Sequence, residues 1–343
     1  MPVKIIENKK IKILRSPKYN YTFNKINGMF ARWGKTEKED PNYCEFGPEI
    51  LDIEVTTICK GPGGKLCPFC YKGNTPNGIN MEFKTFKTIL DKMPRTLTQI
   101  AFGADAQATS NPDLFRMMEY ARSREVVPNI TVADISDEIA DKLVRYCGAV
   151  AVSRYADYDI CYDSVKKLVD GGLDQVNIHF MLSRETYKDA FKTIDDYADD
   201  PRLKGLNAIV FLSLKQKGRG VKYNSITKEE FKKLIDYAFE KKAPIGFDSC
   251  SAPKFLNAVK DRPDYERLEM LAEPCESSCF SSYIDAEGKF FPCSFSEGCD
   301  GWKDGIDVTT CDTFVKDIWN NIRVKQFRNT LIKGKRSCPL YEV

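Results

Sequence analysis

The sequence predicts an α/β fold in which a parallel sheet carries helices on its outside, either open or closed into a barrel. Between residues 51 and 272, short runs rich in β-branched residues alternate with amphipathic segments of helical period. The predicted strands are residues 51–58, 97–102, 130–133, 149–153, 175–181, 206–212 and 244–248. Because a helix separates successive strands, each crossover returns the chain in the same direction, and we expect parallel pairing.

The segments between these strands carry the start signals of helices. Asn111 followed by Pro112 is typical of an N-cap and a first helical residue. Thr227 with Glu230 three residues later has the pattern of a capping box. Ser136 precedes two acidic residues, whose charges suit the positive end of a helix dipole.

The two ends of the chain depart from this alternation. Residues 19–30 alternate around Asn27-Gly28, a dipeptide suited to a tight turn, so we expect a β-hairpin within residues 1–50. Residues 51–272 form the main α/β unit. Residues 273–343 are expected to form a small, metal-stapled domain, because they contain six cysteines: Cys275, Cys279, Cys293, Cys299, Cys311 and Cys338.

Composition excludes several functional classes. The 343 residues carry 52 basic and 49 acidic side chains, and a net charge of +3 gives no strong attraction to nucleic acid or membrane. No apolar run approaches the roughly 18 residues of a membrane helix, and the charged start is not signal-like, so we expect a cytoplasmic protein. His179 is the only histidine, which excludes a zinc site with two histidines. Neither glycine-rich phosphate-binding motif occurs.

The thirteen cysteines point to metal ligation, since a disulfide framework is a poor explanation in a long chain without a secretory signal. Cys59, Cys67 and Cys70 follow the first predicted strand on a loop containing Gly and Pro. Soft thiolates select zinc or iron–sulfur. A [4Fe–4S] cluster held by three cysteines leaves one iron open for a substrate or cofactor. The alternatives are a zinc loop completed from the distant tail, or reduced thiols.

Three cysteines directly after the first strand of a βα series, with Phe69 just before the third, resemble the radical S-adenosylmethionine superfamily over roughly residues 49–343. The family usually has three residues between the first two cysteines, where this chain has seven, while Cys67-Pro68-Phe69-Cys70 matches well. The resemblance implies a partial (β/α)6 TIM barrel with an N-terminal β-hairpin and a small cysteine-rich C-terminal domain. It also implies that Cys59, Cys67 and Cys70 hold a [4Fe–4S] cluster that chelates S-adenosylmethionine.

The resemblance implies further contacts to S-adenosylmethionine. Phe69 would pack near the adenine. The family's Gly-Gly-Glu after the second strand reads Gly103-Ala104-Asp105 here, so a contact through the backbone is expected. Ser153 and Arg154, at the end of the fourth strand, would hold the ribose and carboxylate. Lys215, in a basic stretch after the sixth strand, could bind the same carboxylate or an anionic substrate, or could lie on a solvated loop.

In the tail, Cys275-x12-Gly288-x4-Cys293 is similar to the opening of the SPASM/twitch extensions. The resemblance implies an auxiliary [4Fe–4S] cluster on Cys275, Cys279, Cys293 and Cys338, with Cys299 and Cys311 in reserve. A zinc ribbon would use the same thiolates. Three other cysteines are read as packing residues, as isolated cysteines usually are: Cys44, Cys147 and Cys161.

Three residues are candidates for chemistry on a substrate. Strand alternation places His179 on one face with Asn177 and Met181, directed into the barrel if the apolar face packs on helices. Asp248 and Cys250 follow the seventh strand, where Cys250 could donate a hydrogen atom. The alternatives are a hydrogen-bonded interior histidine and a cysteine in the core.

The resemblance implies an enzyme that cleaves S-adenosylmethionine reductively, with an electron from a flavodoxin- or ferredoxin-type reductant. The resulting 5′-deoxyadenosyl radical would take a hydrogen atom from a peptide or protein side chain. A nucleotide or nucleic-acid base is the alternative substrate. A non-catalytic, zinc-stapled binding protein is the alternative from another class.

Overall fold

Seven parallel strands form the centre of the computed structural model, which describes residues 3–103, 107–155 and 157–343. They are β5 (Ile50–Ile53), β6 (Gln99–Phe102), β7 (Val127–Val132), β8 (Ala149–Arg154), β9 (Val176–Leu182), β10 (Ala208–Ser213) and β11 (Ile245–Phe247). Each pairs in parallel with the next in sequence. All seven predicted strands are therefore confirmed, and β11 adds a short seventh strand to the six implied by the family resemblance.

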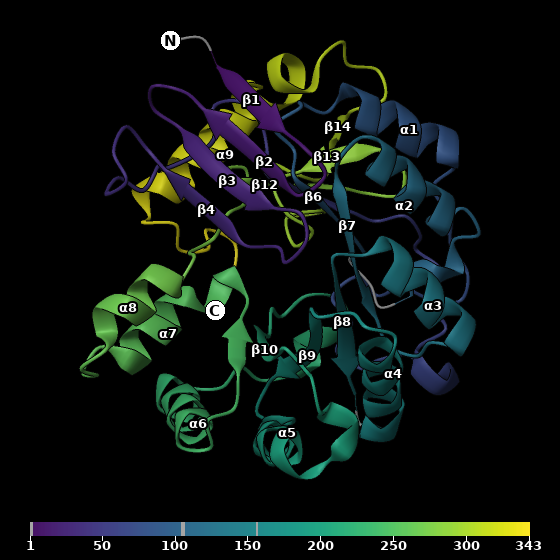
Figure 1. Cartoon of the computed structure of the whole chain (residues 1–343), viewed down its shortest axis with the longest axis vertical. Helices are drawn as coiled ribbons and strands as arrows, with labels where there is room; N and C mark the ends of the chain where they lie inside the picture. The colour runs from purple at the N-terminus through teal and green to yellow at the C-terminus, as the bar shows by residue number, and fades with distance from the viewer. Residues whose placement is uncertain (1–2, 104–106, 156) are drawn as a thin grey trace.

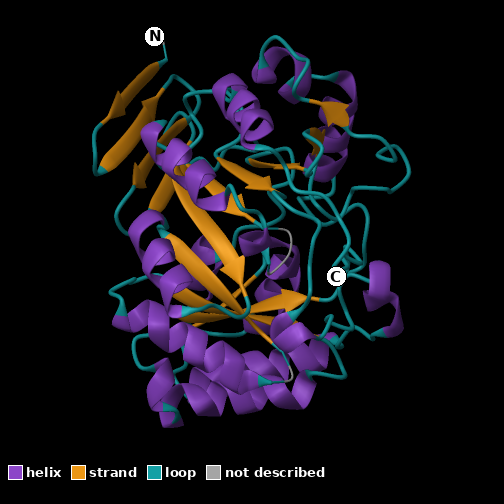
Figure 2. Ribbon diagram, turned by 90° about the vertical axis from the view of Figure 1, so that its right-hand side faces the viewer, coloured by secondary structure: helices purple, strands orange, loops and turns teal. Residues whose placement is uncertain are grey.

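Helices connect these strands and follow one another in an arc outside them (Figure 1). They are α1 (Phe83–Lys92), α2 (Leu114–Ser123), α3 (Asp137–Tyr146), α4 (Tyr158–Asp170), α5 (Tyr187–Asp199) and α6 (Lys228–Glu240). Figure 2 shows the same separation of helices from strands in the second view. Ser136 caps α3, and Thr227 and Glu230 form the predicted capping box of α6.

The predicted start of α2 at Asn111-Pro112 is wrong, since the helix begins at Leu114. The side chain of Asn111 is used elsewhere. Its Nδ2 donates to the carbonyl oxygens of Val55 at 2.6 Å and Met81 at 2.9 Å, and its Oδ1 accepts from the Asp113 amide at 2.9 Å. Asn111 therefore joins the two ends of the loop between β5 and α1.

The strands separate an apolar face from a polar one. In β9 the side chains of Val176, Ile178, Phe180 and Leu182 are buried in the core beneath the helices, as the alternation predicts. His179 and Met181 lie on the opposite face and line a cavity. The polar face of the sheet is thus available for a functional site.

An antiparallel sheet of four strands precedes the main sheet: β1 (Lys4–Glu7), β2 (Ile11–Arg15), β3 (Asn20–Asn24) and β4 (Phe30–Trp33). The predicted hairpin is β3–β4, and the prediction missed β1 and β2. The charged residues in these strands do not follow the alternation expected of a half-buried strand. Lys12 in β2 is nevertheless buried, because its Nζ donates to the carbonyl oxygen of Leu97 at 2.7 Å.

The tail extends the main sheet. After α7 (Ala252–Val259) and α8 (Tyr265–Leu271) come β12 (Ser281–Ile284), β13 (Lys289–Phe291), β14 (Ile306–Asp307) and α9 (Ile322–Lys333). β12 pairs in parallel with β5 and antiparallel with β13. The division of the chain at residues 50 and 272 stays a prediction. Within the described ranges, every helix is too short or too polar to cross a membrane.

Candidate active site

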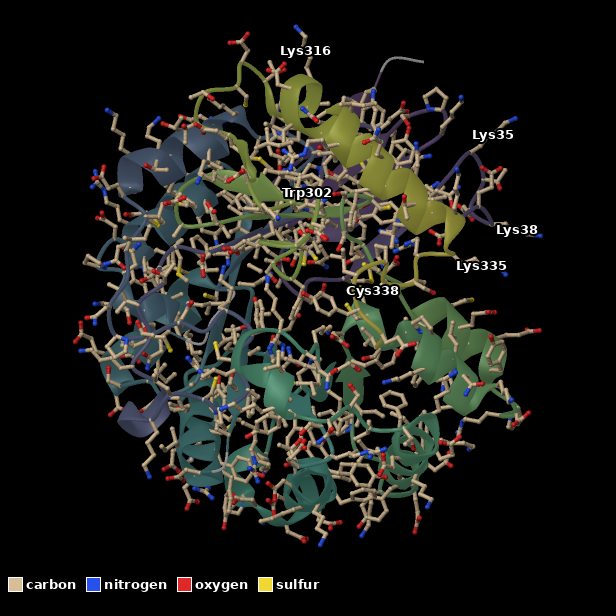
Figure 3. All side chains as sticks on the ribbon, turned by 180° about the vertical axis from the view of Figure 1, so that it is seen from behind. Lys35, Lys38, Trp302, Lys316, Lys335 and Cys338 are labelled. Carbon is tan, nitrogen blue, oxygen red and sulfur yellow. The ribbon has the colours of Figure 1, made fainter. Side chains whose placement is uncertain are left out.

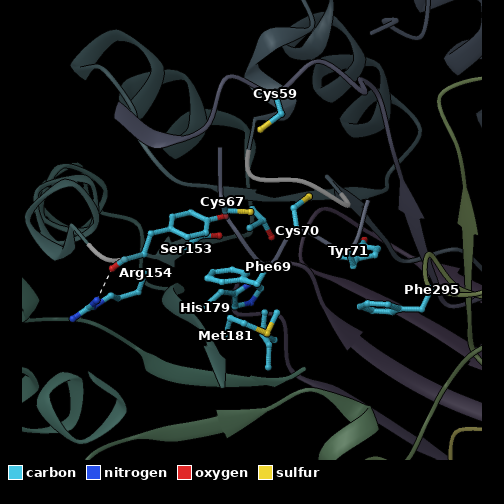
Figure 4. Close-up of a pocket in the computed structure, with 13 residues that line it drawn as sticks. Cys59, Cys67, Phe69, Cys70, Tyr71, Ser153, Arg154, His179, Met181 and Phe295 are labelled. Atoms are coloured by element: carbon cyan, nitrogen blue, oxygen red, sulfur yellow. Dashed lines mark hydrogen bonds between the residues drawn. The ribbon is translucent and has the colours of Figure 1, made fainter. Parts of the chain in front are cut away.

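A cavity of about 240 Å³ lies at the carboxyl ends of the parallel strands (Figure 4). We call it the loop cavity, because the loop between β5 and α1 forms one wall. The residues that line it are Cys59, Cys67, Phe69, Cys70, Tyr71, Thr131, Ser153, Arg154, Tyr155, His179, Met181, Leu212 and Phe295. The structure thus brings together the three cysteines after β5 and four other predicted residues: Phe69, Ser153, Arg154 and His179.

The cysteine loop is held by a segment far away in the sequence. Arg219 donates from its backbone amide to the carbonyl oxygen of Cys70 at 2.9 Å and from its Nε to that of Cys67 at 3.0 Å. The preceding Gly218 has φ +56°, and a Cβ there would lie 2.4 Å from the carbonyl oxygen of Tyr71. Only glycine fits this close approach. Arg219 lies in the basic stretch expected to be a solvated loop, and sequence spacing gave no sign of this supporting role.

Two of the loop cysteines form a hydrogen-bonded pair. The thiol of Cys67 and backbone amides of residues 72–74 contact the sulfur of Cys70, and these bonds lower the pKa of Cys70. The bond to Cys70, together with burial, raises the pKa of Cys67. The lowered pKa favours the thiolate form of Cys70, which is the form that binds metals. Figure 4 shows Cys59 on another part of the wall of the loop cavity, apart from Cys67 and Cys70.

The donor set fits an iron–sulfur cluster. Among the described residues, no group of three or more cysteine, histidine or acidic side chains is placed to hold a single metal ion. A [4Fe–4S] cluster makes a different demand, because each cysteine binds its own iron and the sulfurs stand around a larger body. Cys59, Cys67 and Cys70 all line the loop cavity, as such a body requires.

A second cavity, of about 440 Å³, adjoins the first, and five residues line both: Cys67, Phe69, Arg154, Tyr155 and Met181. We call it the aromatic cavity. The ring of Phe69 is stacked on Tyr155 at 5.7 Å and meets the edge of Tyr223 at 5.7 Å. Arg154 is only 5% exposed, and its Nε has no hydrogen-bond partner among the described residues. A buried donor of this kind needs an acceptor, which a bound ligand could supply.

His179 is half-buried on the floor of the loop cavity. Burial lowers its pKa to about 4, and the charge of Asp248 only partly opposes this shift. His179 is therefore neutral at physiological pH and presents one donor and one acceptor nitrogen.

Other predicted residues lie away from the loop cavity. Lys215 forms an ion pair with Asp248. Burial disfavours the charge on Lys215, but Asp248 and Cys250 more than offset this and raise its pKa. Gly103 follows β6, and its amide donates to the carbonyl oxygen of Ile53 at 3.0 Å. Ala104 and Asp105 lie outside the described residues.

Lys215, Asp248 and Cys250 instead line a third cavity, of about 260 Å³, with residues of the tail. This tail cavity also has Cys275, Cys293 and Cys338 in its wall. Figure 3 shows Cys338 where the tail meets the segment around α7. Phe295 lines both the loop cavity and the tail cavity, so the two cysteine sites share this residue in their walls.

Cys279, expected as a ligand beside Cys275, does not line the tail cavity. It is fully buried in an apolar cluster that contains Leu14, Tyr21 and Leu331. The thiols of two reserve cysteines contact carbonyl oxygens, Cys299 that of Phe295 at 3.3 Å and Cys311 that of Val308 at 3.2 Å. The three cysteines read as packing residues are buried, as expected: Cys44, Cys147 and Cys161.

Comparison with known proteins identifies the fold. No protein-family model and no curated protein sequence matches the chain. Among solved structures, Streptococcus suis SuiB bound to the precursor peptide SuiA aligns with a TM-score of 0.71 and 12% identity, over 95% of this chain and 90% of SuiB. SuiB bound to S-adenosylmethionine aligns over the same shares at 12% identity, with a TM-score of 0.68. BtrN in complex with AdoMet and 2-DOIA reaches a TM-score of 0.48 at 12% identity, over 84% and 88% of the two chains.

The chain therefore has the fold of SuiB over nearly its whole length. The expected fold class is confirmed: an α/β fold like that of SuiB, with a mostly parallel sheet of alternating β/α units and an N-terminal antiparallel sheet.

Proposed function

We propose that this protein is a radical S-adenosylmethionine enzyme that takes a hydrogen atom from a peptide or protein side chain. The observation that carries the proposal is the loop cavity, where Cys59, Cys67 and Cys70 meet Phe69 at the carboxyl ends of parallel strands. The likeness to SuiB supports it, because SuiB binds S-adenosylmethionine on the same fold.

The chain's own residues would hold the cofactors. Cys59, Cys67 and Cys70 would bind a [4Fe–4S] cluster through three irons. When bound, the cluster and S-adenosylmethionine supply the reductive cleavage that yields methionine and a 5′-deoxyadenosyl radical. The aromatic cavity offers Phe69 and Tyr155 as apolar surfaces for a nucleoside base.

Two polar groups would orient the bound molecules. The Nε of buried Arg154, which has no hydrogen-bond partner within the described part of the chain, suits a carboxylate or ribose oxygen. Neutral His179, on the cavity floor, can donate or accept one hydrogen bond to a substrate without adding charge. These residues bind and position, while the apolar walls keep water from the reacting atoms.

A peptide or protein substrate is supported by SuiB, which binds a precursor peptide with the same fold. We place the protein in the cytoplasm, because the thiolates that would bind the clusters must stay reduced, as they do in a reducing compartment. A flavodoxin- or ferredoxin-type protein would supply the electron there. The tail cysteines would hold an auxiliary [4Fe–4S] cluster.

The test is anaerobic turnover of the reconstituted full chain with dithionite and S-adenosylmethionine. We expect 5′-deoxyadenosine from the wild type and none from Cys67→Ala. Cys147→Ala is the matched control, because that thiol is buried in the core and does not line the loop cavity. A folded protein that binds only zinc and releases no 5′-deoxyadenosine would overturn the proposal. Mass spectrometry after turnover with peptides and nucleosides would separate the two substrate classes.

A further inference from the structure

Four thiols from four separate segments of the chain meet in the tail cavity. Cys250 lies just after β11, in a short 3-10 turn over Ser249–Ser251. Cys275 follows α8, Cys293 follows β13 and Cys338 follows α9. The sulfurs of Cys250 and Cys275 are hydrogen-bonded to each other. This cavity therefore joins one cysteine of the main α/β unit to three of the tail.

The fourth thiol that sequence spacing suggests, Cys279, is held elsewhere. Its carbonyl oxygen accepts from the Cys44 amide at 2.9 Å, and its own amide donates to the carbonyl oxygen of Glu276 at 2.9 Å. The preceding Ser278 has φ 56°, a left-handed conformation that fixes this turn. These backbone contacts fix the position of Cys279, whose fully buried side chain lies in an apolar cluster together with Cys275 but does not line the tail cavity, whereas Cys275 does.

Cys250 is fixed in place by its neighbours. Ser251 Oγ donates to the carboxylate of Asp248, and it lies 2.6 Å from Ser213 Oγ. Lys215 contacts both Asp248 and the sulfur of Cys250. These contacts anchor the turn that carries Cys250 to the ends of β10 and β11.

The lining of the tail cavity suits a thiolate centre. Four thiolates concentrate negative charge in a buried place, and Lys215, itself 4% exposed, supplies a positive charge beside Cys250. Hydroxyl groups that can donate to sulfur also line the cavity: Ser249, Ser277, Ser281 and Ser294. Ser277 Oγ already lies 3.3 Å from the sulfur of Cys275. Such contacts around the ligands tune and stabilise iron–sulfur sites.

We propose that Cys250, Cys275, Cys293 and Cys338 together ligate the auxiliary cluster, and that Cys279 is not a ligand. This inference rests on the proposed function for the presence of a cluster, but it assigns the ligands independently. Its consequence is that the centre links the end of β11 to the tail, and therefore ties the two regions together.

The test uses the full chain with Cys59, Cys67 and Cys70 all replaced by Ala, so that only the tail centre can be loaded. After anaerobic reconstitution this background should contain about four iron and four sulfide per chain. Cys250→Ala would leave three cysteines in the cavity, so adding it should either lower the iron and sulfide per chain or leave one iron open and change the electron paramagnetic resonance spectrum of the reduced cluster. Adding Cys279→Ala should change neither the content nor the spectrum. Unchanged content and spectrum with Cys250→Ala, or a change in either with a folded Cys279→Ala, would overturn the assignment.

Cys250→Ser keeps the inference testable if Cys250→Ala fails to fold. A serine oxygen on one iron changes the electron paramagnetic resonance spectrum of the reduced cluster, so we expect a shifted signal. A signal identical to that of the background variant would refute ligation by Cys250. Should the background protein hold zinc instead of iron, the tail centre is not an iron–sulfur cluster, while the proposed function, which rests on the loop cysteines, is decided separately by the release of 5′-deoxyadenosine from the wild type. The ligand assignment is then decided by whether Cys250→Ala, and not Cys279→Ala, removes the zinc.

Discussion

Asn111 offers a sharp test of how the cysteine loop is held. Its side chain is 3% exposed and makes three hydrogen bonds, two of them to the carbonyl oxygens of Val55 and Met81 at the ends of the loop. The oxygen of Val55 keeps the Met81 amide as a second partner, at 2.9 Å. With about 1 kcal/mol for each lost bond, Asn111→Ala should lower the free energy of unfolding by about 3 kcal/mol.

Chemical denaturation of the metal-free chain measures this loss. Asn320→Ala is the matched control, because Asn320 is exposed and its Nδ2 donates to a single carbonyl oxygen, that of Val315, at 3.0 Å. We expect a change within about 0.5 kcal/mol for the control. Asn111→Asp keeps the size but turns an oxygen toward two carbonyl oxygens, so it should destabilise at least as much as Asn111→Ala. If Asn111→Ala matched the control, the clamp would contribute nothing and the reasoning would be refuted.

Three further predictions follow from other contacts. Thr227→Ala removes one half of the capping box of α6 and should cost about 1 kcal/mol in denaturation, whereas Thr330→Ala, on the exposed side of α9, should change little. Burial lowers the pKa of His179 to about 4, against about 6.5 unfolded, so the unfolded chain alone binds this proton as pH falls through that window. Stability should therefore fall by up to about 3 kcal/mol between pH 6.5 and 4, and the fall should be smaller in His179→Gln; an unchanged pH profile would contradict the assignment. Phe69→Ala removes a ring stacked on Tyr155, and equilibrium dialysis of the reconstituted protein should show up to about tenfold weaker binding of S-adenosylmethionine; unchanged affinity would place the adenine elsewhere.

The main sheet was predictable because its signals are local. Each parallel strand is a short apolar run between amphipathic helices, and burial on the helix side leaves the alternation readable, as in Val176–Leu182. The cysteine loop was predictable for the same reason, since Cys59, Cys67 and Cys70 follow one strand directly. Local patterns of this kind place residues at a strand end without knowledge of the remaining contacts.

What escaped prediction depends on contacts between distant segments. Asn111 matches the N-cap pattern, but its side-chain amide donates instead to the carbonyl oxygens of Val55 and Met81, which lie in a distant segment of the chain. In the tail, spacing favours Cys279, which is four residues from Cys275. Cys250 shares this cavity with Cys275 because α7 and α8, which lie between the two cysteines in sequence, return the chain to the end of β11. The periodicity of a single sequence does not show which distant segments the fold brings together.

The parallel pairing of β12 with β5 has a practical consequence for anyone who wishes to shorten this protein. Removing the last seventy or so residues would uncover the backbone amides and carbonyls along one side of β5, which would then be free to join with strands of other molecules. Such a truncated protein should aggregate when expressed.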